Sequence, residues 1–353
     1  MKSIYKTLAV CGAISLAATA LASAQDSSLV SKAKSEGTVT IYTSTDISEA
    51  QPMIDAFKKK YPGVEVNYND LGTVGAYNKT VAEAAAKQVT ADVVWTSAMD
   101  LQMKLASGGY FQKVDLPQKK DIPDWADYKD MLYATSIEPI GMIYNKKLVS
   151  EDKVPHSREE LIKFVQSDVA KGKVATYDPE KSGTGFLFDT NDVQNNNHFW
   201  ELADAFGKAN GKTYSSTGAM KETVVSGENV LAFNLIGSYA LNWIKQSKNL
   251  GLSFDKEHTA AFSRLAGLTN GAPHPAAGQL FLEFLLSKDG QSALAKQGLP
   301  SLRTDVEVGY NIDTINKRVG GNIQPIKVDE GLLTYMDPMK RVKFLKKWQK
   351  ATR

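Results

Sequence analysis

Short β-rich segments alternate with helical segments through most of the chain, and this alternation constrains the fold more than any other feature. Residues 39–42 (VTIY) are β-branched and aromatic, and residues 49–61 then carry apolar side chains at helical spacing until Pro62-Gly63. The same reasoning predicts strands at 64–68, 92–95, 174–177, 230–234 and 250–254, and helices at 74–88, 99–106, 158–164, 193–206, 217–225, 238–245, 281–286 and 290–295. Strands that alternate with helices of this length indicate βαβ units, so we expect an α/β protein with parallel sheets.

The length of 353 residues exceeds what one hydrophobic core usually covers, so we expect two domains. Two extended stretches punctuated by glycine and proline, residues 134–148 and 262–275, have the character of passages between two α/β lobes. The chain would then build lobe one, build lobe two, and return to lobe one. We assign residues 25–136 and 273–353 to lobe one and residues 137–272 to lobe two.

The first 24 residues have the three parts of a secretory signal peptide. Lys2 and Lys6 provide the basic start, residues 8–21 form an apolar run, and Ala22-Ser23-Ala24 is a small-residue cleavage site. The run is shorter than the roughly 20 apolar residues of a membrane-spanning helix. A lipoprotein site at Cys11 is disfavoured because the apolar run continues past it. We predict cleavage after Ala24 and a protein located in the bacterial periplasm.

Charge and cysteine content exclude several classes of protein. The formal net charge is +3, and cleavage would remove two lysines, no acidic residue and the only cysteine. The small remaining charge does not indicate nucleic acid or an anionic membrane surface as a partner. A mature chain without cysteine has no disulfide and no cysteine-ligated zinc site.

Motifs for cofactors, metals and catalysis are incomplete. Residues 207–213 (GKANGKT) end like a phosphate-binding P-loop but are one residue short between the glycines. Residues 183–185 lack the third glycine of a dinucleotide-binding motif, and Gln194 stands where a calcium loop beginning at Asp189 requires glycine. We therefore expect no cofactor, no metal ion and no enzymatic activity.

Six segments with recognisable sequences follow one another in order. They are residues 39–46 (VTIYTSTD), 57–66 (FKKKYPGVEV), 91–100 (ADVVWTSAMD), 141–148 (GMIYNKKL), 229–241 (NVLAFNLIGSYAL) and 271–305. Together they resemble the bacterial extracellular solute-binding proteins of ABC importers, in particular the branch with ferric-ion, phosphonate and sugar-phosphate binders. The resemblance implies a two-lobed periplasmic-binding-protein fold, type II-like, with two crossover strands and a ligand cleft between the lobes. It also implies delivery of a small solute to an ABC permease in the inner membrane, and we expect a monomer.

Polar residues directly after the predicted strands, and at the starts of the helices that follow, are the candidate ligand-binding residues. In open α/β sheets, ligands bind beyond the carboxyl ends of the strands, and free N–H groups at helix starts attract anions. The candidates are Thr43, Ser44, Thr45, Asp46, Ser97, Tyr177, Asp178, Ser182, Gly183, Thr184, Asn234, Ser238 and Tyr239. Each Ser or Thr among them could instead simply cap its helix.

Two further candidates lie in the predicted crossovers. Glu138 could read a hydroxyl or an amine of the ligand. Arg264 could meet a carboxylate or a phosphate, or could form a surface ion pair. The hydroxyl-rich loops favour a small anionic organic solute such as a phosphonate, a sugar phosphate or an organic acid.

Four alternatives remain open at this point. Ferric binders of the resembled branch use adjacent tyrosines near the position of Tyr239, which here has Ser238 and Ala240 as neighbours, so the pair is absent. A polyamine binder would need acids with aromatic residues, and Asp46, Glu138 and Asp178 are available. The same three acids could serve a secreted hydrolase or transferase. A receptor that reports ligand to a membrane sensor would have the same clamp with a different partner.

Overall fold

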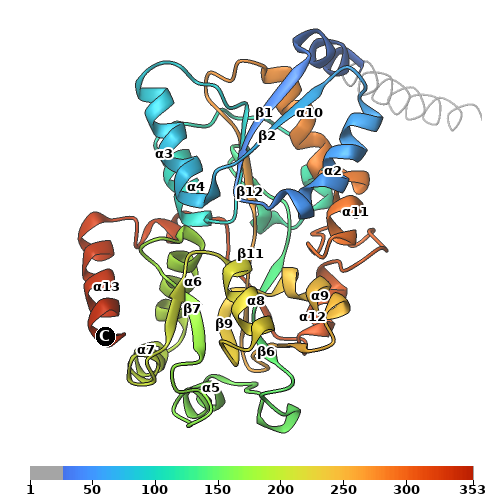
Figure 1. The fold of residues 1–353 in the computed structure, drawn as a ribbon. Coiled ribbons are helices and arrows are strands. Elements are labelled where there is room, and N and C mark those ends of the chain that lie inside the picture. Colours follow the sequence, from blue (N-terminus) through green and yellow to red (C-terminus); the bar gives the residue numbers. More distant parts are fainter. Residues whose placement is uncertain (1–26, 353) are drawn as a thin grey trace, which may run out of the picture.

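The computed structural model describes residues 27–352 and shows two α/β lobes, one above the other in Figure 1. Each lobe is built on one β-sheet with helices packed around it. The predicted α/β class and two-lobed architecture are thus confirmed. The predicted signal peptide, residues 1–24, lies outside the described residues. Within the described part of the chain, no helix is long and apolar enough to span a bilayer.

Lobe one contains a six-stranded sheet in the order β2-β1-β3-β12-β5-β4. Its strands are β1 (Thr38–Thr43), β2 (Glu65–Asp70), β3 (Val93–Thr96), β4 (Asp127–Tyr128), β5 (Leu132–Ala134) and β12 (Leu265–Leu268). Its helices are α2 (Ile47–Lys60), α3 (Gly72–Ala85), α4 (Met99–Ser107), α10 (Pro275–Leu286) and α11 (Lys288–Lys296), with short 3₁₀ turns η1 (Pro117–Asp121) and η2 (Asp124–Ala126). Strands β1, β2 and β3 are parallel, as βαβ connections require.

Lobe two contains a seven-stranded sheet in the order β13-β11-β6-β9-β7-β8, with β10 paired to β6. Its strands are β6 (Glu138–Asn145), β7 (Val174–Tyr177), β8 (Lys212–Tyr214), β9 (Leu231–Ile236), β10 (Leu250–Ser253), β11 (Thr259–Phe262) and β13 (Ile323–Pro325). Its helical elements are η3 (Glu151–Lys153), α5 (Arg158–Val165), α6 (Gly183–Asn195), α7 (Phe199–Lys208), α8 (Thr217–Ser226), α9 (Gly237–Gln246), α12 (Ile312–Arg318) and α13 (Pro338–Ala351). Strands β7, β8 and β9 are parallel.

The two crossover strands run side by side between the lobes. Ala134 pairs with Leu265 in the sheet of lobe one, and a few residues further Glu138 pairs with Phe262 in the sheet of lobe two. The links between the sheets are therefore residues 135–137 in one direction and 263–264 in the other. This arrangement confirms the two predicted crossovers.

The C-terminal segment departs from its predicted place. Helices α10 and α11 lie in lobe one, as expected, but β13 pairs with β11 in the sheet of lobe two. Helix α13 then packs against α7, where Phe344 and Trp348 lie against Phe186 and Phe199. The assignment of all of residues 273–353 to lobe one therefore needs correction from α12 onward, because α12 lies beside α9 (Figure 1) and the apolar face of α13 is covered by lobe two.

Residues 326–336 connect β13 to α13 and touch lobe one on the way; we call them the C-terminal strap. The strap contains η4 (Glu330–Leu333), which lies against α4. Its Glu330 pairs with Lys129 at 2.9 Å, and the Val328 N–H donates to the Trp125 carbonyl oxygen at 3.3 Å. The strap thus begins and ends in lobe two and holds lobe one only through noncovalent contacts.

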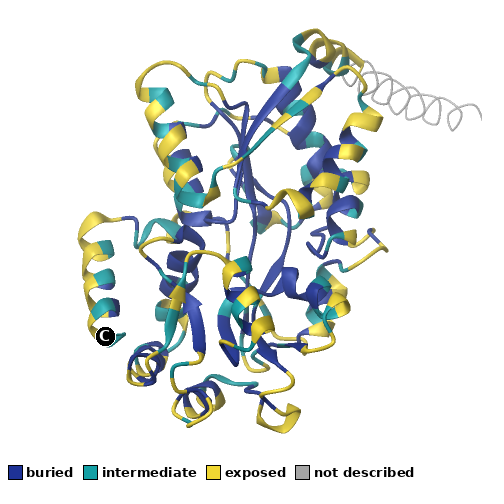
Figure 2. Ribbon diagram, in the orientation of Figure 1, coloured by how far each residue is buried: buried dark blue, intermediate teal, exposed yellow. Residues whose placement is uncertain are grey.

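The apolar core follows the strands of both lobes, whose interiors are buried while the outer faces of the helices are exposed (Figure 2). In lobe one, Phe57 of α2 meets Phe281 and Phe284 of α10 edge to face, with ring centroids 5.4 and 5.5 Å apart. This packing holds the helices in place, so that the loops after the strands have a rigid base.

Candidate ligand-binding site

A pocket of about 280 Å³ lies between the two lobes. It is lined by Ser44, Asp46, Asp70, Gly72, Thr73, Ser97, Tyr177, Ser182, Thr184, Ser215, Ser216, Thr217, Gly218, Ile236 and Tyr239. These residues follow β1, β2 and β3 in lobe one and β7, β8 and β9 in lobe two. Because the two sets of strands are each parallel, their carboxyl ends meet at the cleft, where α/β proteins bind ligands.

Hydroxyl groups from both lobes form a hydrogen-bonded chain in this pocket. The Ser44 Oγ and Ser97 Oγ atoms are 3.1 Å apart, and Ser97 Oγ is 2.8 Å from Thr184 Oγ1 of lobe two. Ser97 and Thr184 are almost completely buried. Each hydroxyl can donate or accept, so these three hydroxyl groups can turn their protons toward an anionic group that enters the pocket.

Six helices begin at the pocket, three from each lobe. In lobe one, α2, α3 and α4 start without a hydrogen bond from the side chain of the N-cap residue, and so does α9 in lobe two. The Ser182 side chain accepts from the Gly185 N–H at the start of α6, and the Ser216 side chain accepts from the Ala219 N–H at the start of α8. Ser182 is therefore a helix cap and a pocket residue at once. The positive ends of these helices favour a negatively charged ligand group.

Two tyrosines form part of the pocket wall. The Tyr177 hydroxyl is hydrogen-bonded to Thr217 Oγ1, and the Tyr239 hydroxyl accepts from the Asp46 N–H across the cleft at 3.4 Å. Burial raises the pKa of both phenols above the ordinary value. Both tyrosines are therefore neutral hydrogen-bonding groups in the unliganded pocket.

Two carboxylates, Asp46 and Asp70, lie at the exposed side of the pocket. Partial burial raises the pKa of Asp46, Arg264 lowers it, and the nearby charge of Asp70 adds to the increase. Asp70 Oδ1 accepts the Gly72 N–H at 3.2 Å, at the start of α3. The lining therefore combines buried hydroxyls with exposed acids, and it includes no Lys, Arg or His side chain.

Direct contacts across the pocket join the lobes. Besides the Ser97–Thr184 and Asp46–Tyr239 hydrogen bonds, the Gly183 N–H donates to Thr73 Oγ1 at 3.2 Å. The predicted residue Gly183 is thus an interlobe contact next to the pocket. The lobes are closed on each other in this structure.

Five predicted residues lie away from the pocket in buried positions: Thr43, Thr45, Glu138, Ser238 and Arg264. Arg264 donates from Nε to Glu138 Oε1 at 2.9 Å and from Nη2 to Glu138 Oε2 at 3.3 Å, and neither side chain is exposed at all. We call Thr45, Ser136, Glu138, Ser238 and Arg264 the crossover ion-pair cluster.

The remaining bonds of the crossover ion-pair cluster satisfy its other polar atoms. Ser136 and Ser238 donate to the Glu138 carboxylate, and Arg264 Nη1 donates to Thr45 Oγ1 at 2.9 Å. The Arg264 guanidinium also lies 5.1 Å from the centre of the Tyr239 ring. Arg264 is therefore a buried partner of Glu138 rather than a surface ion pair, and it supports the pocket wall from behind. Thr43 accepts the Thr45 N–H at 3.0 Å.

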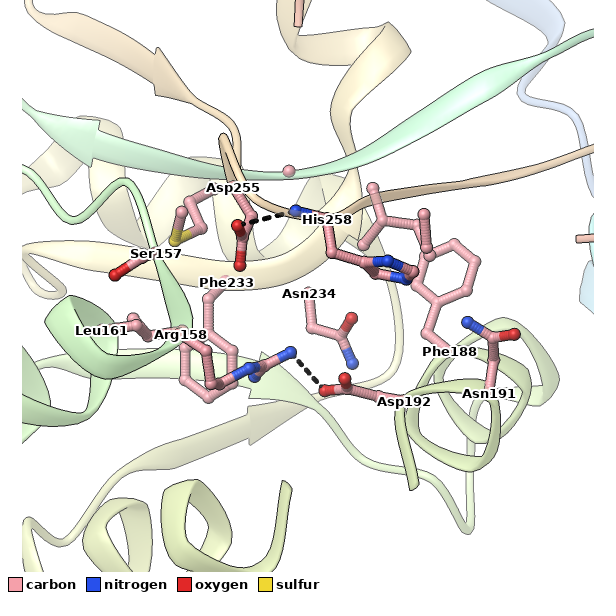
Figure 3. A pocket seen from close by; sticks show the side chains of 14 residues that line it. Ser157, Arg158, Leu161, Phe188, Asn191, Asp192, Phe233, Asn234, Asp255 and His258 are labelled. Atoms are coloured by element: carbon pink, nitrogen blue, oxygen red, sulfur yellow. Dashed lines mark hydrogen bonds and ion pairs between the residues drawn. The ribbon is translucent and has the colours of Figure 1, made fainter. Parts of the chain in front are cut away.

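Asp178 and Asn234 also lie outside the pocket. Asp178 pairs with Lys181 at 2.9 Å and accepts the Glu180 N–H at 3.0 Å, in the turn before α6. Asn234 has a positive φ of 56° and donates from Nδ2 to Asp189 Oδ1 at 2.6 Å. Its side chain lines a separate pocket inside lobe two (Figure 3).

The pocket in Figure 3 has a volume of about 60 Å³, too small for an organic solute. Three of its charged groups already have partners, because Arg158 bonds to Asp192 and the carboxylate of Asp255 accepts the backbone N–H of His258 at 3.1 Å. A larger hollow of about 440 Å³ lies in lobe one near Ala91, at the amino end of β3. Neither hollow joins the two lobes. Among the described residues, no group of three His, Cys, Asp or Glu side chains is arranged to hold a metal ion.

Sequence reasoning missed eight lining residues. One is Ile236 at the end of β9, and the others form two groups: Asp70, Gly72 and Thr73, and Ser215, Ser216, Thr217 and Gly218. The signal for them was present, since both groups follow a strand and open a helix. Asp70 follows a predicted strand that ends two residues too early. Residues 215–218 follow β8, whose three residues are too short for a periodic pattern.

Comparison with known proteins agrees with this architecture. The profile of the family described as bacterial extracellular solute-binding protein matches residues 52–315, most of the chain. The chain therefore belongs to the bacterial extracellular solute-binding proteins, as the resemblance predicted. Members of this family are binding proteins rather than enzymes and serve ABC importers. No curated protein sequence matches the chain.

Solved structures share the fold. The substrate-binding protein of an ABC transporter from Agrobacterium tumefaciens is 35% identical, with a TM-score of 0.85 over 90% of this chain and 94% of that one. Iron-bound HitA from Pseudomonas aeruginosa is 18% identical, with a TM-score of 0.71 over 90% of this chain and 99% of that one. AfuA from Actinobacillus pleuropneumoniae, with fructose-6-phosphate bound, is 19% identical, with a TM-score of 0.71 over 90% and 98%. The last two similarities establish the fold alone.

Proposed function

We propose that this protein captures a small organic solute with an anionic group in the periplasm and delivers it, as a monomer, to an ABC permease in the inner membrane. The observation that carries the proposal is the interlobe pocket, where hydroxyls of both lobes and the starts of six helices converge. Neutral donors of this kind bind phosphates and carboxylates without a cationic side chain.

Closure of the lobes follows from the same geometry. Ser44 and Ser97 belong to lobe one, whereas Ser182 and Thr184 belong to lobe two. An anion that accepts hydrogen bonds from both sets interacts most favourably with the closed arrangement. Such a ligand shifts the population toward the closed form, which is the form that a permease can distinguish from the empty one.

The alternatives receive less support from the site. A ferric site needs phenolates, and burial raises the pKa of Tyr177 and Tyr239, which opposes their ionisation. A hydrolase that uses two of the predicted acids has only Asp46 in the pocket, since Glu138 is paired with Arg264 and Asp178 with Lys181. Binding without catalysis is therefore the function that the pocket favours.

The experiment is a thermal-shift and calorimetric screen of phosphonates, sugar phosphates and carboxylates with the mature protein and with the double variant Ser97→Ala/Thr184→Val. A ligand that binds only the folded state raises Tm in proportion to its occupancy. We expect at least one anion to raise Tm, and the double variant to bind it at least tenfold more weakly. The matched control is Ser107→Ala/Thr213→Val, which changes the same residue types at exposed positions outside the pocket. If only polyamines or neutral sugars raise Tm, the proposal is wrong.

A further inference from the structure

The interlobe pocket has neutral hydroxyl groups at its buried residues and carboxylates at its exposed residues. Its buried part contains Ser97, Ser182 and Thr184, each at most 5% exposed, whereas Asp46 and Asp70 are accessible at the exposed side. An anion at the hydroxyls therefore lies in the same pocket as two carboxylates.

No basic side chain lines the pocket to offset these carboxylates, although the buried charge of Arg264 opposes the increase that burial causes in the pKa of Asp46. The lining includes no basic side chain, and the nearby Arg264 is fully buried and doubly hydrogen-bonded to Glu138. A ligand that carries only negative charge would meet two like charges without an opposite one, which disfavours its binding. Two exposed acids in the lining of an anion site thus select against simple anions.

Helix capping accounts for one oxygen of Asp70 and for neither oxygen of Asp46. The side chain of Asp46 makes no capping hydrogen bond to α2, although Asp46 is its N-cap residue. Asp70 precedes Leu71, the N-cap residue of α3, and accepts the N–H of Gly72 through Oδ1 only. Carboxylates that face a pocket in this way are suited to a bound ammonium group.

Resting on the function proposed above, we infer that the solute is a short zwitterion whose anionic group binds the buried hydroxyls and helix starts while its ammonium group binds Asp46 and Asp70. The pocket volume of about 280 Å³ matches a molecule of this kind, because it corresponds to roughly nine water molecules. The class comprises aminoalkyl phosphonates, aminoalkyl phosphates and amino acids with a short spacer.

The test uses probes that differ only in the amine. Ethylphosphonate is compared with 2-aminoethylphosphonate, and propanoate with 3-aminopropanoate, by calorimetry on the mature protein at pH 7.5. For the head group that binds, we expect the amine-bearing probe to bind at least tenfold more tightly. Equal or weaker binding of the amine-bearing probe overturns the inference and leaves the proposed function standing.

A charge-removing variant provides the second measurement. In Asp46→Asn/Asp70→Asn, we expect the amine-bearing probe to bind at least tenfold more weakly and the amine-free anion to bind more tightly. Changes in the same direction for both probes overturn the inference. Asp55→Asn/Asp204→Asn is the matched control, because both residues are exposed and lie outside the pocket. If no anion of either kind binds while a polyamine such as spermidine does, the proposed function fails as well.

Discussion

Two polar clusters meet at the junction of the lobes, and they contain similar residue types in opposite situations. The crossover ion-pair cluster is fully buried, and its carboxylate, guanidinium and hydroxyls bond to one another. The interlobe pocket also has carboxylates and hydroxyls, but its acids face accessible space without a cation. A buried polar group must find its partner within the protein, whereas a binding site keeps groups available for a ligand.

This difference separates structural from ligand-binding residues more sharply than residue type does. Glu138 and Asp46 are both acids near the cleft, yet only Glu138 has its charge balanced internally. Substitutions in the crossover ion-pair cluster should therefore alter stability, and substitutions in the pocket should alter affinity. The following predictions test that division, and they begin with the largest expected effect.

Arg264→Met should destabilise the fold by about 3–5 kcal/mol, because Glu138 would remain buried without its cation. The double variant Glu138→Met/Arg264→Met should recover most of this loss. Urea unfolding measures both. Lys60→Met is the control, since its pair with Asp289 is exposed and should contribute less than about 1 kcal/mol. A loss as small as that of the control would mean that the buried pair does not support the fold.

Asp100→Asn should stabilise the protein by an amount that grows with pH. Asp100 is buried in α4, its Oδ2 has no hydrogen-bond partner among the described residues, and burial raises its pKa to about 7. The folded state therefore holds this proton more tightly than the unfolded state, and stability is lost as the pH rises from the ordinary carboxyl range to about 7. Between pH 5 and pH 8 the gain from the Asn variant should increase by about 2 kcal/mol.

Urea unfolding at several pH values checks this prediction. Asp55→Asn, on the exposed face of α2, should show no such trend. A gain that is constant with pH would contradict a raised pKa at Asp100.

Gly183→Ala should weaken ligand binding about tenfold, or about 1.4 kcal/mol, and leave unfolding unchanged. A methyl group there would lie 2.9 Å from Thr73 Oγ1 and 3.0 Å from Leu101 Cδ1, both in lobe one, so the closed lobes would be forced apart. Gly218→Ala is the control in the same pocket, because nothing lies within 4 Å of its added methyl group. Calorimetry with the probe that binds best measures the difference, and equal affinities of the two variants would contradict it.

Asp178→Asn should have the smallest effect, less than about twofold on affinity or about 0.4 kcal/mol. Its carboxylate pairs with Lys181 outside the pocket. The same calorimetric titration detects any change, and a tenfold loss would place Asp178 in contact with the ligand.

The alternation of strands and helices was sufficient to predict the α/β class, since each long element has its own periodicity. The chain length and two extended stretches with Gly and Pro predicted the two lobes and both crossovers. The three-residue strands β8 and β13 carry no periodic signal and were missed. In α13, the apolar residues Val342, Leu345 and Trp348 recur every three positions, yet the buried pair is Phe344 and Trp348, and Val342 is 51% exposed. Lysines and apolar residues alternate closely along this helix, so the sequence alone does not show which of two faces is the buried one.

The candidate site was predictable as far as the rule that ligands bind beyond the carboxyl ends of parallel strands applies. Seven of the predicted residues line the pocket because they lie at or just after the ends of parallel strands. They are Ser44, Asp46, Ser97, Tyr177, Ser182, Thr184 and Tyr239. Thr45 and Ser238 are their immediate neighbours in sequence but face the interior. Side-chain direction and the pairing of Glu138 with Arg264 depend on contacts between distant segments, which a single sequence does not display.

The C-terminal strap adds a noncovalent tie between the lobes to the crossover strands of the hinge, because it begins and ends in lobe two and touches lobe one in between. Two adjacent strands alone would allow the lobes both to bend apart and to twist about each other. The strap holds lobe one through contacts that include the exposed ion pair of Glu330 with Lys129 and a backbone hydrogen bond of Val328, and these contacts resist twisting. Because exposed ion pairs are weak and screened by salt, this tie opposes opening only slightly. The strap therefore restricts twisting more than opening, so we expect the same two faces of the lobes to meet at each closure.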